Sequence, residues 1–306
     1  MTSYTTLLEG ASTLTKLGVR PSPEHGEFRR IRTSLAPVTD AAAREWAVHL
    51  IAEGACVASF VRSVWVLWID PANRDAIESI YRIKGDKRIG RPISTTLGAD
   101  RFVELLDPDQ IAPGVRDIFL APRELERRFG MLCLIRAPIK KSAVHLLPPE
   151  IVSQRADGTY WLQNCVMSGS APVVALVQAM QDAGVSFPAV TSMNLSGQRE
   201  IVDRDEAEAF SREHGIPLVL TGPEQKPEVR GSFPIIEVGR LGVKLVREGQ
   251  FPGYLFRHLL DGAEVDLAGA KPARFPLVVT HSEKEAAGLS AYRLREEIIM
   301  RLEARG

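Results

Sequence analysis

The sequence predicts an α/β protein whose sheet contains both parallel and antiparallel strands. Short apolar runs, such as Val64–Trp68 and Val243–Val246, have the composition of buried strands. Segments between many of these runs carry apolar residues at the spacing of an amphipathic helix. Strictly alternating strand–helix–strand units are missing, which favours a mixed sheet over a purely parallel one.

The first predicted helix begins after Asp40 and ends at Gly54. An aspartate side chain can accept from the free N–H groups at a helix start, and glycine suits the backbone that commonly ends a helix. Between them, Trp46, Leu50 and Ile51 lie at helical spacing.

Two strands, Cys56–Phe60 and Val64–Trp68, are predicted next, separated by the polar pair Arg62-Ser63. Trp65 and Trp68 are three residues apart, so they should face opposite sides of the second strand. A turn then leads to Asn73, which can cap a helix that ends near Lys84.

The remaining elements follow from the same patterns. Helices broken at Pro108 and Pro113 are expected between residues 99 and 129. The further predicted strands are Met131–Arg136, Trp161–Val166, Phe187–Thr191, Pro217–Leu220, Phe233–Val238, Val243–Val246 and Pro276–Thr280. The further predicted helices are Ala171–Ala183, Asp203–Glu213, Tyr254–Leu260 and Lys284–Ala304.

The composition is that of a globular protein without a charge bias. The chain has 306 residues, 45% hydrophobic and 25% charged, and its 38 Lys and Arg residues balance 38 Asp and Glu residues. A dedicated nucleic-acid binder usually carries a basic field, so RNA binding would need a local patch. The N-terminus lacks the pattern of a signal peptide, and the apolar runs are too short to span a bilayer. We therefore expect a cytoplasmic protein without a membrane partner.

A metal centre is not expected. The cysteines, Cys56, Cys133 and Cys165, are far apart and lie in apolar runs, which is typical of small core residues. The six histidines form no HxH or HExxH pattern.

Two segments carry a family resemblance. From Gly54 to Gly85 the sequence matches, without a gap, the pattern GGVVAFPT(D/E)TVYGLGCDA-N-EAV-RIY-IKGRP, and TSMNLSG at Thr191–Gly197 matches TSAN-SG. Weaker matches lie in Gly231–Val238 and in LVREG at Leu245–Gly249. Over about residues 40–250 the chain thus resembles the YrdC family, the threonylcarbamoyl-AMP synthases.

The resemblance implies a YrdC-like fold: a twisted, open mixed sheet with flanking helices and a concave basic face. In the family this face binds ATP, threonine and bicarbonate. The carboxylated amine of threonine attacks the α-phosphate, giving pyrophosphate and a threonylcarbamoyl-AMP that feeds a tRNA modification. The resemblance also implies ATP as a substrate, with or without Mg²⁺, and no tightly bound cofactor.

Such chemistry needs cations for the phosphates and preorganised hydrogen-bond donors. Lys84 and Arg247 supply positive charge, and Arg88 lies in a loop one residue longer than the family's. The seven candidate binding residues are Ser63, Lys84, Arg88, Ser192, Asn194, Ser232 and Arg247. No residue is assigned a catalytic role.

The departures from the family pattern fall on polar positions. Val61 and Arg62 replace a threonine and an acid, Trp68 replaces a glycine, and Asp86 stands where an arginine would meet phosphate. Reversing one charge at ~4 Å changes an interaction worth about 4 kcal/mol at an effective dielectric of 20. These changes argue against the standard reaction.

Two hypotheses follow. In the first, the chain binds a nucleotide or an acyl-adenylate-like ligand and forms a carbamoyl-adenylate from ATP, bicarbonate and an amino acid such as threonine. In the second, it is a catalytically inactive YrdC-like module that binds RNA or a protein partner. The predicted organisation is a polar N-terminal extension over 1–39, a YrdC-like domain over 40–250 and a C-terminal strand–helix appendage over 251–306. The oligomeric state is not predicted.

Overall fold

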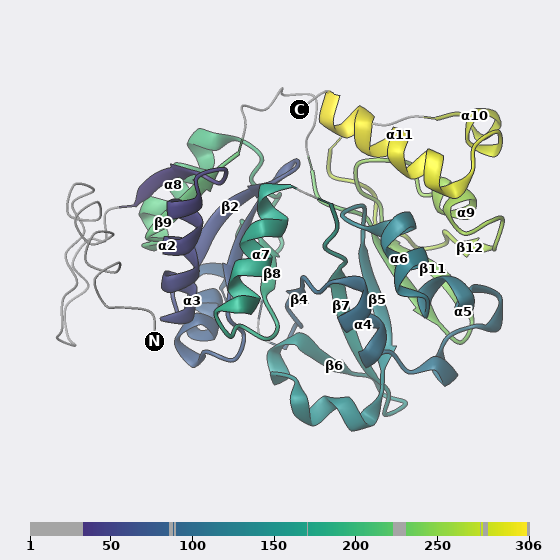
Figure 1. Cartoon of the computed structure of the whole chain (residues 1–306), viewed down its shortest axis with the longest axis horizontal. Helices are drawn as coiled ribbons and strands as arrows, with labels where there is room; N and C mark the ends of the chain where they lie inside the picture. The colour runs from purple at the N-terminus through teal and green to yellow at the C-terminus, as the bar shows by residue number, and fades with distance from the viewer. Residues whose placement is uncertain are drawn as a thin grey trace.

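A computed structural model describes residues 33–85, 88, 90–169, 171–222, 231–275, 277 and 281–304. Most of the predicted extension, and all of the predicted strand Pro276–Thr280 except residue 277, lie outside the described residues. The part of the chain that the structure describes forms one twelve-stranded mixed sheet flanked by helices (Figure 1). The predicted fold class is therefore confirmed.

The strands and helices alternate irregularly along the chain. The strands are β1 (Ser34–Pro37), β2 (Val57–Val61), β3 (Val64–Ile69), β4 (Ser94–Thr95), β5 (Leu134–Ile139), β6 (Val152–Gln154), β7 (Tyr160–Cys165), β8 (Ala189–Ser192), β9 (Leu218–Thr221), β10 (Ile235–Gly239), β11 (Gly242–Arg247) and β12 (Val265–Asp266). The α-helices are α2 (Ala41–Ala52), α3 (Arg74–Lys84), α4 (Ala99–Leu105), α5 (Pro113–Phe119), α6 (Pro122–Phe129), α7 (Pro172–Asp182), α8 (Arg204–His214), α9 (Leu255–Leu259), α10 (Glu283–Ala287) and α11 (Ala291–Ala304). Short 3₁₀ turns occupy Pro108–Gln110, Lys141–Leu146 and Pro149–Ile151.

The strand order is β1-β9-β2-β3-β8-β4-β7-β5-β10-β11-β12, with β6 paired to β7 at the side. The sheet is mixed because β2 and β3 form an antiparallel hairpin, whereas β9 runs parallel to both β1 and β2. The order is not the order of the sequence, so strands that are distant in the chain become neighbours. Most importantly, β8 pairs with β3, which brings the second motif segment beside the first.

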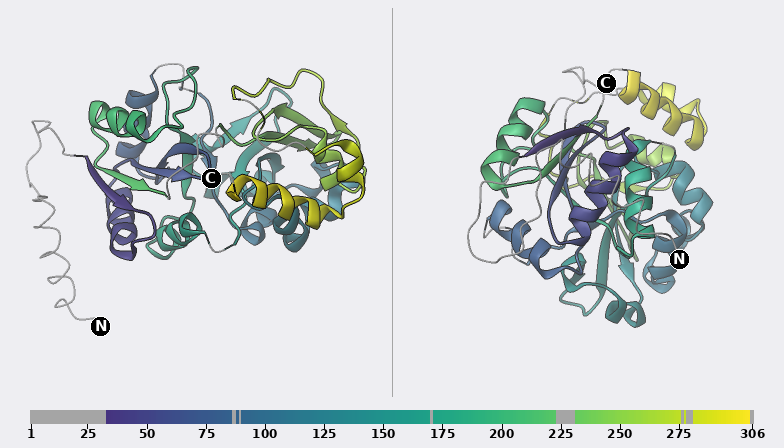
Figure 2. Two further views of the ribbon diagram at one scale, coloured as in Figure 1. Left: turned by 90° about the horizontal axis from the view of Figure 1, so that it is seen from above. Right: turned by 60° about the vertical axis from the view of Figure 1, so that its left-hand side comes forward.

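The helices cover the sheet on both faces. α2 and α7 pack together on one side of the sheet (Figure 2). There, Ile51 and Leu176 join Val66 of β3 in one hydrophobic cluster. α3 covers the opposite face, where Ile80 packs in the larger cluster with Leu67. Both faces of the β2–β3 hairpin are thus buried, which explains the predominantly apolar sequence of its two strands.

The C-terminal residues continue the same sheet and the same core. β12 pairs in parallel with β11, and Phe251 and Phe256 are fully buried in the cluster that also contains Phe129 of α6. α11 packs against α6 and α9 (yellow in Figure 1). At the other end, β1 lies within the predicted N-terminal extension and pairs with β9.

The bounds of two predicted elements differ markedly from those in the structure. The predicted strand Met131–Arg136 begins at Leu134, because Met131 has a left-handed backbone (φ +55°) that a strand does not accept. The strand then continues to Ile139 through Pro138, which pairs with Trp161 of β7 beyond the end of the β10 pairing at Arg136. The predicted helix Lys284–Ala304 is two helices, α10 and α11, because the backbone turns at Gly288, the C-cap of α10.

Among the described residues, none of the helices combines the length and the apolar content that crossing a membrane requires.

Candidate functional site

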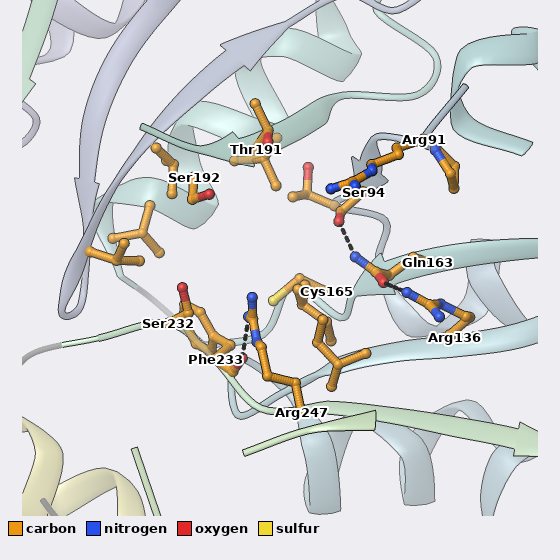
Figure 3. Close-up of a pocket in the computed structure, with 18 of the residues that line it drawn as sticks. Arg91, Ser94, Arg136, Gln163, Cys165, Thr191, Ser192, Ser232, Phe233 and Arg247 are labelled. Atoms are coloured by element: carbon orange, nitrogen blue, oxygen red, sulfur yellow. Dashed lines mark hydrogen bonds between the residues drawn. The ribbon is translucent and has the colours of Figure 1, made fainter. Parts of the chain in front are cut away.

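A cavity of about 550 Å³ opens on one face of the sheet (Figure 3). Its walls come from strands that are far apart in sequence, including β3, β8, β7, β5 and β11. The cavity is therefore a product of strand order, and both motif segments contribute to it.

The apolar floor comes from alternate positions of β3. Val64, Val66 and Trp68 line the cavity, whereas Trp65 faces the other side and packs edge-on against Phe60 at 5.4 Å between ring centroids. The prediction that the two tryptophans face opposite sides is confirmed. Trp68 is held in place because its indole Nε1 donates to the hydroxyl of Ser59 at 2.6 Å.

Five cationic side chains line the cavity: Arg88, Arg91, Arg136, Arg247 and Lys271. No Asp or Glu is among the lining residues that the structure describes. A low-dielectric wall with one sign of charge concentrates anions. The cavity thus favours a phosphorylated or carboxylated ligand.

The side chain of Arg247 points into the cavity beside Ser232 and Phe233 (Figure 3). Its Nη2 donates to the carbonyl of Phe233 at 2.6 Å, and its Nη1 lies 3.8 Å from a carboxylate oxygen of Glu200. Burial lowers the pKa of Arg247, and the charge of Glu200 raises it in part. The same Glu200 oxygen accepts a hydrogen bond from Ser232 at 2.6 Å.

Arg88 occupies the basic loop after α3. Its Nη2 donates to the carbonyl of Pro92 at 2.9 Å, which folds the loop toward the cavity. Burial lowers the pKa of Arg88 to about 10, although Tyr81 raises it and Arg91 lowers it further. Asp86, the predicted charge reversal, lies outside the described residues.

Lys84 does not line the cavity but contacts the loop after β8, whose Ser192 does. The amine donates to the carbonyl of Ser192 and to the Oδ1 of Asn194, the latter at 2.8 Å. Burial lowers the pKa of Lys84 to about 7; Arg88 lowers it further, and Glu200 raises it. The Ser192 hydroxyl donates to the same Asn194 oxygen at 2.7 Å, so Lys84 and Asn194 together hold the loop that presents Ser192.

The sequence candidates thus fall into two groups. Arg88, Ser192, Ser232 and Arg247 line the cavity. Ser63, Lys84 and Asn194 do not. Ser63 is fully buried, and its hydroxyl donates to the carbonyl of Gly231 at 2.8 Å, so it anchors the tip of the β2–β3 hairpin.

Several lining residues were not singled out from the sequence, among them Ser94, Arg136, Gln163 and Lys271. Arg136 and Gln163 pair directly across β5 and β7, and both interrupt apolar strands at positions that face the cavity. A charged or amide side chain inside an apolar strand is the signal that could have revealed them.

The fold and the cavity define an α/β protein of YrdC-like architecture with a cationic site on its sheet. Neither a known protein family nor a curated protein sequence matches the chain. Several solved structures do match the chain. The chain is similar to Sua5 from P. abyssi complexed with L-threonine, with a TM-score of 0.55, 17% identity, and coverage of 90% of this chain and 77% of that one. A double variant of the same Sua5 matches with a TM-score of 0.56, 17% identity, and coverage of 90% and 76%.

YciO from E. coli matches with a TM-score of 0.51, 15% identity, and coverage of 71% of this chain and 94% of that one. Sua5 and YciO have the YrdC-like fold, so the fold implied by the sequence motifs is confirmed. At this level of identity the likeness establishes the fold and leaves the reaction to be argued from the site.

Proposed function

We propose that the cavity binds a nucleotide or an acyl-adenylate-like ligand. The observation that carries this proposal is the charge of the cavity lining. Five cationic side chains line the cavity, and no described lining residue is a carboxylate. The chain of a triphosphate or the phosphate of an adenylate supplies the anionic partner that such a wall favours. The apolar floor at Val66 and Trp68 suits the base or the acyl group.

The reaction we propose to test is carbamoyl-adenylate formation from ATP, bicarbonate and an amino acid such as threonine. The amine and bicarbonate give a carbamate and water. A carbamate oxygen then bonds to the α-phosphorus, and the bond to pyrophosphate breaks. Charge moves onto the leaving pyrophosphate, which fixed guanidinium groups such as Arg247 would stabilise.

No group of three or more histidine, cysteine or acidic side chains in the described ranges could hold a metal ion. Since the described lining also offers no carboxylate, Mg²⁺ would be held by the phosphates of ATP rather than by the protein.

The proposal predicts that Arg247→Met weakens ATP binding by about 10- to 100-fold, the size of one lost charge-assisted hydrogen bond. Isothermal titration of ATP, AMP and pyrophosphate measures this change. The matched control is Arg74→Met, which removes a cation whose side chain is 90% exposed on α3, and it should bind ATP as the wild type does. Equal affinity of Arg247→Met and wild type would exclude Arg247 from the site.

A second assay tests the reaction. The protein is incubated with ATP, bicarbonate and each amino acid, and pyrophosphate and a carbamoyl-adenylate are sought by mass. Nucleotide binding without product would limit the proposal to binding. If ATP, AMP and pyrophosphate all fail to bind, while RNA binds with a steep dependence on salt, the inactive-module hypothesis is favoured instead.

A further inference from the structure

One side of the cavity carries a connected polar chain that the candidate residues do not include. Arg136, Gln163 and Ser94 lie on the neighbouring strands β5, β7 and β4, and all three line the cavity. Arg136 Nη2 donates to Gln163 Oε1 at 2.9 Å, and Gln163 Nε2 lies 2.5 Å from the hydroxyl of Ser94. Figure 3 shows this chain beside Arg91, across the cavity from Ser192 and Ser232.

The direction of each hydrogen bond in this chain is determined. A guanidinium only donates, so the Gln163 oxygen must face Arg136. The amide nitrogen must then face Ser94, whose oxygen accepts. The Ser94 hydroxyl hydrogen is not used in this chain, and it is available to an acceptor in the cavity.

The charge of Arg136 is only partly neutralised. Its neighbour Glu237 lies 2.5 Å from the guanidinium of Arg155 but 3.8 Å from that of Arg136. Arg155 itself stacks on Trp161, with 3.4 Å between the guanidinium carbon and the ring centroid, and does not line the cavity. Glu237 is therefore engaged mainly by Arg155, and Arg136 keeps a charge for the cavity side. Burial lowers the pKa of Arg136; Glu237 raises it in part, and Arg155 lowers it further.

The opposite side of the cavity has the reverse polarity. The hydroxyls of Ser192 and Ser232 donate away from the cavity, to Asn194 and Glu200, at 2.7 and 2.6 Å. Their lone pairs remain for the cavity, so these two side chains can accept hydrogen bonds from a ligand. Arg136 and Ser94 can therefore donate to a ligand on one side. Ser192 and Ser232 can accept from it on the other, where Arg247 adds a second cation beside Ser232.

We propose that Arg136, Gln163 and Ser94 form an oxyanion subsite, which binds a carboxylate or phosphate group of the ligand while Ser192 and Ser232 accept from a hydroxyl or N–H group at its other end. Arg136 supplies the charge, Ser94 donates its hydroxyl hydrogen, and Gln163 positions both. The inference rests on the proposed function only in placing the ligand in this cavity.

The test compares binding of inorganic phosphate, pyrophosphate, ATP and L-threonine to the wild type and three variants by isothermal titration. Arg136→Met is expected to weaken binding of at least one probe by about 10- to 100-fold. Ser94→Ala, which removes one neutral donor, should weaken the same probe by about 2- to 10-fold. Gln163→Glu places a fixed carboxylate against Arg136 and should weaken it at least tenfold. Arg74→Met again serves as the control, and thermal unfolding verifies that each variant is folded.

The probe that responds identifies the group: phosphates for a phosphate subsite, L-threonine for a carboxylate subsite. If all three folded variants bind every probe within twofold of the wild type, the subsite is overturned. If ATP does not bind but phosphate or pyrophosphate binds in a manner that depends on Arg136, the proposed function is overturned and the subsite is supported. Failure of every probe to bind the wild type overturns both.

Discussion

Lys84→Met is expected to remove a rise in stability that the wild type shows above neutral pH. The ordinary pKa of lysine is 10.5, and in the folded protein burial lowers that of Lys84 to about 7. Between these values the unfolded chain holds a proton that the folded chain does not, so the free energy of unfolding increases with pH. The limiting slope is about 1.4 kcal/mol per pH unit, and the whole window corresponds to roughly 5 kcal/mol.

The geometry of Lys84 explains the direction. A neutral amine has two N–H groups, and the structure provides two acceptors, the Ser192 carbonyl and Asn194 Oδ1. The protonated amine would bring a third N–H and a full charge into the same buried position. Below pH 7 the folded protein carries this charge, and the penalty is fully present.

Urea unfolding at pH 6, 7, 8, 9 and 10 measures the effect. The difference in free energy of unfolding between wild type and Lys84→Met should increase with pH in favour of the wild type. Lys244→Met, which removes a half-exposed lysine of β11, is the matched control and should follow the wild-type profile. Parallel profiles for wild type and Lys84→Met would show that Lys84 is charged in the folded protein across this range.

Phe256→Ala is expected to destabilise the whole protein by about 3–5 kcal/mol, the usual result of removing a buried aromatic ring. Phe256 is fully buried, with ring centroids 5.3 Å from Phe251 and 6.5 Å from Phe129. Since this cluster joins the C-terminal segment to α6, we expect both parts of the chain to unfold together.

Tryptophan fluorescence can test this cooperativity because all four tryptophans, Trp46, Trp65, Trp68 and Trp161, precede residue 250. In guanidinium unfolding, Phe256→Ala should lower the midpoint of the fluorescence transition and of the circular dichroism transition equally. Met300→Ala, an exposed change in the same C-terminal segment, should leave both midpoints unchanged. A fluorescence midpoint that does not move in Phe256→Ala would show that the C-terminal segment unfolds on its own.

Many element boundaries could be predicted because the interactions that determine them are local. Asp40, Asn73 and Asp203 precede helices in the sequence, and in the structure each side chain accepts from a backbone N–H in the first turn. The failures lie where distant contacts decide. At Pro138 the strand continues because it pairs with Trp161 of β7, and no local pattern indicates that distant pairing.

The sequence identified only some of the residues that line the cavity, because distant strand pairing decides which side chains face it. The motifs identified Ser192 and Arg247, which line the cavity. They also identified Lys84, whose amine does not line the cavity but donates to the backbone carbonyl of Ser192. Arg136 is the last residue of the predicted strand Met131–Arg136, and it was not among the candidate binding residues. In the structure it lies in the middle of β5, opposite Gln163.

The sequence by itself determined the α/β class, the YrdC-like fold and most helix and strand positions, since hydrophobic periodicity, caps and motif spacing act over short distances. Only the tertiary structure decided which polar residues meet. Strand order places β4, β7 and β5 beside one another, so that Ser94, Gln163 and Arg136 connect across the sheet. Whether a side chain faces a cavity or supports its wall depends on such long-range pairing, which the local sequence does not encode.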